Sequence, residues 1–261
     1  MGLKDRVVLV TGSTSGIGLG IARAMTEAGA SVMLNGFGDP AAIAALQEEL
    51  GRAYDVRVGY HGADMSRPDE VAALVHATRE QLGGLDVLVN NAGIQHTAPI
   101  ESFPRERWDA VLAINLSAAF HAMQAVIPGM KAAGWGRIIN IASAHGLVAS
   151  AQKSAYVAAK HGLIGLTKVG AIEMAGDGIT VNAICPGWVL TPLVEAQLTD
   201  RAAREGTSIE DVKRRLLMEK QPMAEFTTPA SLGALAVFLC SDAARTMTGA
   251  SLSMDGGWVA A

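Results

Sequence analysis

A short apolar segment followed by a glycine-rich turn near the amino terminus places the strongest constraint on the fold. Val7–Val10 is long enough for a buried strand and too short for a helix, and Gly12, Gly16 and Gly18 follow it closely. A helical pattern then runs to Ala28. Glycines in such a turn let the backbone approach a phosphate, and the free N–H groups at the start of the helix favour an anion. The segment therefore predicts a βαβ unit that binds the pyrophosphate of a nucleotide.

Other short apolar segments alternate with helical patterns along the chain and predict a parallel sheet. The expected strands are Val7–Val10, Ser31–Asn35, Arg57–His61, Val87–Asn90, Ile138–Ile141, Thr180–Pro186 and Ser251–Met254. The fold expected is α/β, a single-domain Rossmann-type doubly wound parallel sheet of about seven strands. The composition suits close backbone packing, since 50% of the residues are hydrophobic, only 5% are aromatic and 29 are glycine. Because no repeat or linker interrupts the sequence, we expect residues 1–261 to form one domain.

The charge pattern and the cysteines narrow the class of partner. The formal net charge is −4, with acidic and basic residues interspersed, which argues against nucleic acid or an anionic membrane as the main partner. Cys185 and Cys240 lie in apolar surroundings without metal-ligand spacing, so we expect buried thiols and no metal site. Met1–Arg6 and the segment after it contain no apolar region of signal-peptide length. We therefore expect a cytoplasmic protein that acts on a small molecule.

A serine, a tyrosine and a lysine near the fifth expected strand have the chemistry of a proton-transfer site. Ser143 follows Ile138–Ile141, at the sheet edge where α/β folds bind ligands. Tyr156 and Lys160 are four residues apart in a helical pattern, so they share one helix face. An ammonium group nearby lowers the pKa of a tyrosine, and Tyr156 could then exchange a proton with an alcohol or ketone while Ser143 donates to the same oxygen. A tyrosine and a lysine at this spacing also occur by chance, so the pair alone does not establish a catalytic site and the other motifs of the chain are needed as evidence.

Several motifs occur in one order along the chain. They are Gly12-xxx-Gly16-x-Gly18, Asn90-Asn91-Ala92-Gly93, Asn115, Ser143, Tyr156-xxx-Lys160 and Pro186-Gly187. In this order and spacing they resemble the short-chain dehydrogenase/reductase family, and the resemblance covers essentially the whole chain. It implies a nicotinamide-dependent oxidoreductase with Asn115, Ser143, Tyr156 and Lys160 as the catalytic group, in which Asn115 holds a water molecule that links Lys160 to solvent. It also implies a homotetramer.

The same resemblance implies a set of cofactor-binding residues. They are Gly12, Thr14, Ser15, Gly16, Ile17, Gly18, Phe37, Asp64, Met65, Asn91, Ala92, Gly93, Tyr156, Lys160, Pro186, Gly187, Val189 and Thr191. Asp64 would accept a hydrogen bond from the adenine amino group, and capping of the helix that starts near Pro68 is its alternative role. No Lys or Arg occurs in Ser13–Ser15 or Asn35–Asp39, and Phe37 replaces the acid usual at the ribose. Because a ribose 2′-phosphate would lack a charge partner, we expect NAD.

Residues near the catalytic motifs indicate a small hydroxy acid as the substrate. The segments NNAGIQH, SAHGLVAS and QKSAYVAAKHG resemble those of a group within the family, the bacterial D-3-hydroxybutyrate dehydrogenases. This resemblance implies a substrate site made of Gln95, Ser143, His145, Lys153, Tyr156, Trp188, Gln197 and Trp258. A carboxylate calls for the Lys153 ammonium in a site screened from water, whereas a polyol does not. Packing, capping or solvation are the alternative roles for His145, Lys153 and the two tryptophans.

A charged helical segment after the sixth expected strand is the expected substrate lid. It spans residues 193–222, with helical patterns at Glu195–Arg204 and Ser208–Glu219. Such an insertion could close over a substrate and exclude water, and the alternative is a solvated pair of surface helices.

Three other functions of the protein are open at this point. A 3-oxoacyl carrier-protein reductase or a polyol dehydrogenase would share the fold and the catalytic group, and a non-catalytic dinucleotide-binding protein would use the fold alone.

Overall fold

One parallel sheet organises the chain. The computed structural model describes residues 2–260, apart from the side chains of residues 193 and 197. In that part of the chain seven strands pair in the order β3-β2-β1-β4-β5-β6-β7, all parallel. The strands are β1 (Val7–Val10), β2 (Ser31–Asn35), β3 (Val58–His61), β4 (Val87–Asn90), β5 (Gly136–Ile141), β6 (Ile179–Pro186) and β7 (Ser251–Met254). The order reverses direction between β1 and β4, which is where such sheets bind ligands. The predicted Rossmann-type fold is confirmed.

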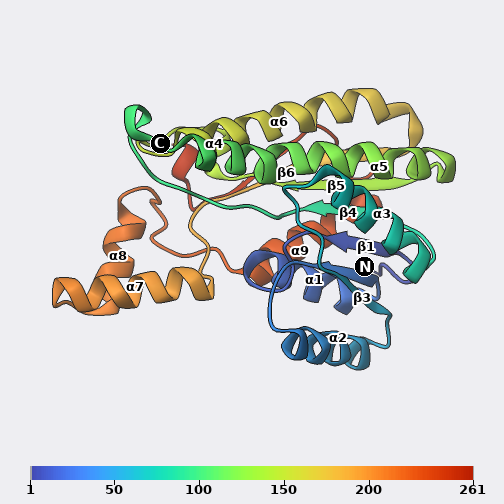
Figure 1. The fold of residues 1–261 in the computed structure, drawn as a ribbon, viewed down its shortest axis with the longest axis horizontal. Coiled ribbons are helices and arrows are strands. Elements are labelled where there is room, and N and C mark those ends of the chain that lie inside the picture. Colours follow the sequence, from blue (N-terminus) through green and yellow to red (C-terminus); the bar gives the residue numbers. More distant parts are fainter. Residues whose placement is uncertain (1, 261) are drawn as a thin grey trace.

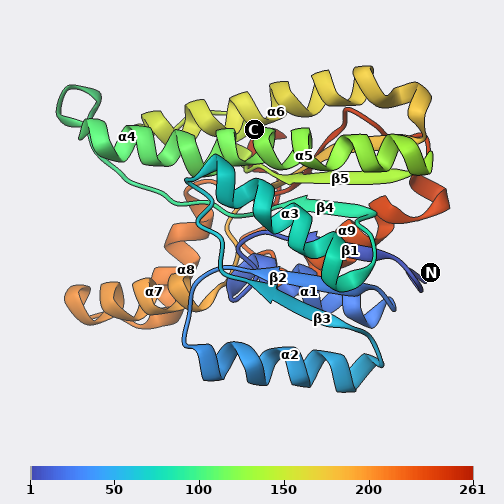
Figure 2. The same cartoon turned by 45° about the vertical axis from the view of Figure 1, so that its right-hand side comes forward.

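Helices cover both faces of the sheet (Figure 1, Figure 2). One face carries α1 (Gly16–Glu27), α2 (Pro40–Tyr54) and α9 (Pro229–Cys240), and the other carries α3 (Pro68–Leu82), α4 (Arg105–Leu112), α5 (Ala118–Ala133) and α6 (Ser154–Met174). Each face has its own apolar core, with Ile21 and Leu232 in one and Leu74 and Met174 in the other. The strands are buried on both sides, which explains why they read as continuous apolar segments.

Two glycines allow α1 and α9 to pack closely beside the sheet. A Cβ atom on Gly20 would lie 2.4 Å from Pro229 Cβ, and a Cβ on Gly233 would lie 2.6 Å from Ala24 Cβ. Any side chain at either position would therefore separate the helices. This packing fixes the amino-terminal end of α1, which is the end that faces the sheet's carboxyl edge.

A long helical segment, Arg105–Ala133, contains α4, a π-helical turn at Ala113–Ser117 and α5. It is long and apolar enough to cross a membrane by length and composition, a property that core helices also have. Here it packs against α3, α6 and the sheet. The sequence pattern predicted a helix over Trp108–Lys131 but not the π-helical turn, which places Asn115 at an irregular point of the helix.

Two helices follow β6 and extend away from the sheet (orange in Figure 1). They are α7 (Pro192–Glu205) and α8 (Ile209–Met218), and their bounds lie close to those predicted for the insertion. Thr191 and Ser208 cap their amino ends, since each side chain accepts a hydrogen bond from a backbone N–H in the first turn. A small apolar cluster that includes Leu198 and Val212 holds the pair together.

Candidate active site

A cleft of about 1230 Å³ lies at the carboxyl ends of the strands. It is larger than a typical pocket for one drug-sized ligand and has room for a dinucleotide beside a small substrate. Every residue predicted to bind cofactor or substrate lines it, except Gly18 and Gln197. Gly18 lies inside α1, and the side chain of Gln197 lies outside the described part of the chain. The predicted catalytic residues Ser143, Tyr156 and Lys160 line the cleft, and Asn115 lines a smaller neighbouring cavity.

The glycine-rich turn has the geometry of an anion site. Gly12 has a φ of +62° and Gly16 a φ of +56°, and a Cβ on Gly18 would lie only 2.2 Å from the Gly12 carbonyl oxygen. The N-cap residue Ser15 makes no side-chain cap hydrogen bond, so the first N–H groups of α1 are left for a ligand at the cleft. Asn91 supports the turn, because its Nδ2 donates to the carbonyl oxygens of Thr11 and Gly12. These residues fit the pyrophosphate of a dinucleotide.

The end of the cleft at β2 carries no cation in its described lining. Phe37 is 69% exposed there, and its carbonyl oxygen accepts a hydrogen bond from Thr14 Oγ1 at 3.0 Å. Asp64 Oδ1 accepts from the Ser66 N–H at 2.8 Å, and this bond holds the pKa of Asp64 below its ordinary value. The N-cap of α3 is Arg67, so Asp64 shapes the turn before the helix and does not cap it. The two lysines in the cleft lining, Lys153 and Lys160, lie with the tyrosine at its other end.

Lys160 is buried beneath Tyr156. Lys160 is only 4% exposed. Its Nζ donates to the Ile141 carbonyl oxygen at 2.7 Å and lies 5.7 Å from the centre of the Tyr156 ring. Burial lowers the pKa of Lys160 to about 8. Burial also raises the pKa of Tyr156, and a hydrogen bond with Ser143 opposes that rise. The expected lowering of the tyrosine pKa by Lys160 is therefore not found, because desolvation of the phenolate dominates.

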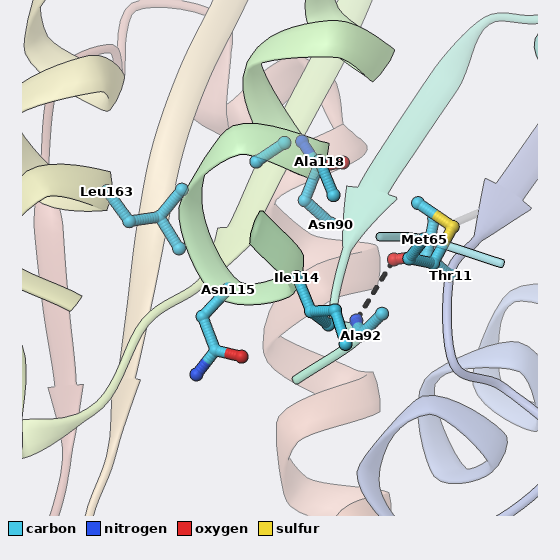
Figure 3. Close-up of a pocket in the computed structure, with 9 residues that line it drawn as sticks. Thr11, Met65, Asn90, Ala92, Ile114, Asn115, Ala118 and Leu163 are labelled. Carbon is cyan, nitrogen blue, oxygen red and sulfur yellow. Dashed lines mark hydrogen bonds between the residues drawn. The ribbon is translucent and has the colours of Figure 1, made fainter. Parts of the chain in front are cut away.

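Asn115 joins the long helix to the segment that follows β4. Its Oδ1 accepts from the Ile94 N–H at 2.8 Å and its Nδ2 donates to the Ile94 carbonyl oxygen at 2.9 Å. The small cavity beside it is lined by Thr11, Met65, Asn90, Ala92, Ile114, Asn115, Ala118, Ala119 and Leu163 (Figure 3). It has room for about one water molecule. The buried Asn90 Oδ1, which has no protein partner among residues 2–260, is an acceptor at this place.

A neutral histidine lies beside the serine and tyrosine. The backbone N–H of His145 donates to Ser143 Oγ at 3.1 Å, and the ring Nε2 of His145 lies 2.9 Å from Ser150 Oγ. Burial, followed by the positive charges of Lys153 and Lys220, lowers the pKa of His145 to about 4. At neutral pH the ring is therefore an uncharged hydrogen-bonding group.

Two tryptophans and a lysine complete this end of the cleft. Trp188 and Trp258 are stacked with ring centres 6.3 Å apart, and Trp258 meets the His145 ring edge-on at 4.9 Å. Lys153 Nζ lies 5.7 Å from the Trp188 ring centre. Burial, followed by the charge of Lys220, lowers the pKa of Lys153. A half-buried ammonium beside the Trp188 ring, which stacks on Trp258, is suited to a small anion with a short apolar group.

Some residues that line the cleft, and one buried residue behind it, were not predicted from the sequence. Ile94, His96 and Thr97 line the cleft around Gln95, and their position directly after the Asn-Asn-Ala-Gly motif was the available signal. Gln221 is fully buried and its Oε1 accepts from the Trp188 N–H. Its sequence context gives no signal, because the two residues are far apart in the chain.

Comparisons with known proteins place the chain in a family. A family model described as enoyl-(acyl carrier protein) reductase matches residues 12–259. The D-beta-hydroxybutyrate dehydrogenase of Cupriavidus necator is 60% identical over 99% of both chains, and that of Rhizobium meliloti is 51% identical over 98% of this chain and 99% of its own. A crystal structure of L-sorbose reductase from Gluconobacter frateurii, complexed with NADPH and L-sorbose, is 31% identical with a TM-score of 0.95 and covers 100% of this chain and 99% of its own. The protein described here belongs to the short-chain dehydrogenase/reductase family.

Proposed function

We propose that the protein is an NAD-dependent oxidoreductase that interconverts D-3-hydroxybutyrate and acetoacetate. The observation that carries this proposal is the 60% and 51% identity to two D-beta-hydroxybutyrate dehydrogenases along nearly the whole chain. The cationic, aromatic end of the cleft supports it independently, because Lys153 lies where a small carboxylate substrate would meet the serine and tyrosine.

Each member of the catalytic group has a role that its position supports. Tyr156 is the general acid and base, and Ser143 donates a hydrogen bond to the substrate oxygen. A nicotinamide cofactor held in the cleft would supply the hydride chemistry that interconverts the alcohol and the ketone. Lys160, whose pKa is about 8, holds or releases a proton near neutral pH. Asn115 fixes the segment at Ile94 and so supports a proton path from Lys160 towards solvent.

The substrate is held by its carboxylate. Lys153 supplies the positive charge, and neutral His145 and exposed Gln95 supply hydrogen bonds at the same end of the cleft. Trp188 and Trp258 form a wall that limits the alkyl group to a short one. Gln197 would approach from α7, which we propose to be part of a lid made by residues 193–222.

The cofactor is NAD, in preference to NADP. No Lys or Arg lines the described cleft near Phe37, where the ribose 2′ position would lie, so a 2′-phosphate would have no charged partner. The unblocked amino end of α1 and the close approach of Gly12 and Gly18 suit the pyrophosphate that both dinucleotides share.

The oligomer is a homotetramer in the cytoplasm. Phe120 on α5 and Val169 and Ile172 on α6 are exposed apolar side chains, 46%, 51% and 79% exposed respectively, and a second subunit would cover them. Cys185 and Cys240 are buried free thiols, in line with a reducing compartment. Light scattering at micromolar concentration tests the assembly, and a monomer would contradict it.

A substrate panel tests the function. Purified enzyme with NAD is assayed with D- and L-3-hydroxybutyrate, threitol and a 3-hydroxyacyl thioester, and kcat/KM is compared. We expect D-3-hydroxybutyrate to exceed each of the others by at least about 100-fold. A higher value for the polyol or the thioester would contradict the proposed substrate.

A further inference from the structure

The α7–α8 insertion ends with a buried glutamine behind the cleft. Gln221 follows α8 and has no exposed surface. Its backbone N–H donates to the Leu217 carbonyl oxygen at 2.7 Å, and its own carbonyl oxygen accepts from the Ala224 N–H at 2.9 Å. Ala224 adopts a left-handed φ of +49°, so the chain reverses tightly immediately after Gln221. The glutamine side chain is thus held at a fixed point between the insertion and the body of the protein.

The Gln221 amide binds the main chain of Trp188. Oε1 accepts from the Trp188 N–H, and Nε2 donates to the Glu225 carbonyl oxygen at 2.8 Å. The Thr227 N–H donates to the Trp188 carbonyl oxygen at 3.0 Å, so both main-chain polar groups of Trp188 are held by residues 221–227, where the insertion ends. Trp188 therefore has no freedom to move independently of residues 221–227.

The same amide is enclosed by glycines on both sides. A Cβ on Gly187 would lie 2.5 Å from Gln221 Oε1, and a Cβ on Gly256 would lie 3.0 Å from Gln221 Nε2. The turn is also tied to the second segment, since the Met223 N–H donates to the Gly256 carbonyl oxygen at 3.0 Å. Gln221 thus lies between the segment that carries Trp188 and the segment that carries Trp258.

We infer that Gln221 is a positioning residue that sets the Trp188–Trp258 wall and thereby the fit of the hydroxy acid. Gln221 is not among the described residues that line the cleft. It acts through the main chain of Trp188 and the backbone of Gly256. The stacked rings lie against His145 and beside Lys153, so a shift of Trp188 moves the apolar wall relative to the carboxylate-binding lysine. This role rests on the proposed function for its substrate, but the position of the tryptophans can be measured without it.

The experiment compares Gln221→Met with a matched glutamine elsewhere. Methionine has a similar volume and removes both amide hydrogen bonds, leaving the Trp188 N–H without its partner. Gln47→Met is the control, because Gln47 Nε2 also donates to a backbone carbonyl, that of Val58 at 3.0 Å, on α2 away from the cleft. Gln221→Glu keeps an oxygen that can accept from Trp188 and is the conservative variant.

For Gln221→Met we expect the KM for D-3-hydroxybutyrate to rise at least about fivefold, with NAD affinity and kcat within about twofold of the wild type. The KM of Gln221→Glu should lie between the values of the wild type and of Gln221→Met. Gln47→Met should leave KM, kcat and NAD affinity unchanged. Acrylamide quenching of tryptophan fluorescence should increase in Gln221→Met and not in the control.

The fluorescence arm separates this inference from the proposed function. Failure of the wild type to oxidise 3-hydroxybutyrate overturns the function, while quenching still reports on the tryptophans. Unchanged quenching in Gln221→Met overturns the positioning role, and so does a rise in KM no larger than that of Gln47→Met. If Gln221→Met does not fold, the same readouts on Gln221→Glu decide, and wild-type values for that variant in both assays overturn the role.

Discussion

Replacing Lys153 by methionine removes the positive charge from the substrate end of the cleft with little change in length. The Lys153 ammonium is half-buried beside Trp188, and its lowered pKa shows that the site disfavours a charge that has no anionic partner. A carboxylate that binds there gains a charge-assisted hydrogen bond, worth about 1.5–3 kcal/mol. The variant should therefore lose about 10- to 150-fold in kcat/KM for acetoacetate reduction.

A neutral ketone of similar size separates carboxylate binding from support of the tyrosine. The enzyme should reduce such a ketone weakly, and Lys153→Met should change its kcat/KM by less than about threefold, because no carboxylate contact is lost. Lys168→Met, at an exposed position of α6, is the control and should leave both substrates unaffected. Equal losses on acetoacetate and on the ketone would refute the assignment of Lys153 to the carboxylate.

The same variant has a second readout that requires no substrate. Lys153 is the largest charged contributor to the lowered pKa of His145, after burial. Removing the ammonium should raise that pKa from about 4 towards the ordinary value, although burial will keep it low. NMR titration of His145 in the two proteins measures the change, and an unchanged pKa would mean that the two side chains do not interact.

Three further predictions concern the catalytic group and the cofactor. Tyr156→Phe removes the proton carrier but keeps the ring, so kcat should fall at least about 100-fold while NAD binding persists; near-normal turnover would contradict the mechanism. Phe37→Arg should shift the ratio of kcat/KM for NADP over NAD upward by at least about tenfold, because it supplies a partner for the 2′-phosphate, and an unchanged ratio would show that the ribose lies elsewhere. Lys160 has a folded pKa of about 8, below its ordinary 10.5, so its buried charge destabilises the fold below pH 8 and this penalty disappears as the pH rises to 10.5. Denaturant titrations should therefore show the free energy of unfolding of the wild type rising relative to Lys160→Met by about 3 kcal/mol across that interval, and a difference independent of pH would contradict the burial of the charge.

Local patterns were sufficient to predict the sheet. β1, β2 and β4 begin and end where the apolar segments do, because a strand buried on both faces leaves a continuous hydrophobic segment. The helical pattern also predicted the insertion helices, over Glu195–Arg204 and Ser208–Glu219, close to the observed α7 and α8. The pattern did not identify Thr191 and Ser208 as their caps.

Features that depend on distant contacts were not predictable in the same way. The π-helical turn around Asn115 depends on its two hydrogen bonds to Ile94, and helical periodicity carries no sign of them. The family resemblance placed Trp188 and Trp258 in the expected substrate site, but they lie in two separate segments and nothing in the sequence indicates that their rings stack. The raised pKa of Tyr156 reflects how completely the surrounding chain excludes water, which spacing between Tyr156 and Lys160 does not report.

Transfer of deuterium from substrate to cofactor is the most direct test of the central proposal. D-3-Hydroxybutyrate labelled with deuterium at C3 is incubated with the enzyme and NAD, and both products are analysed by mass spectrometry. We expect acetoacetate as the oxidised product, one deuterium in the reduced cofactor, and neither product above background with Tyr156→Phe on the wild-type timescale. Reduced cofactor without deuterium, or an oxidised product other than acetoacetate, would contradict direct hydride transfer between 3-hydroxybutyrate and NAD in this cleft.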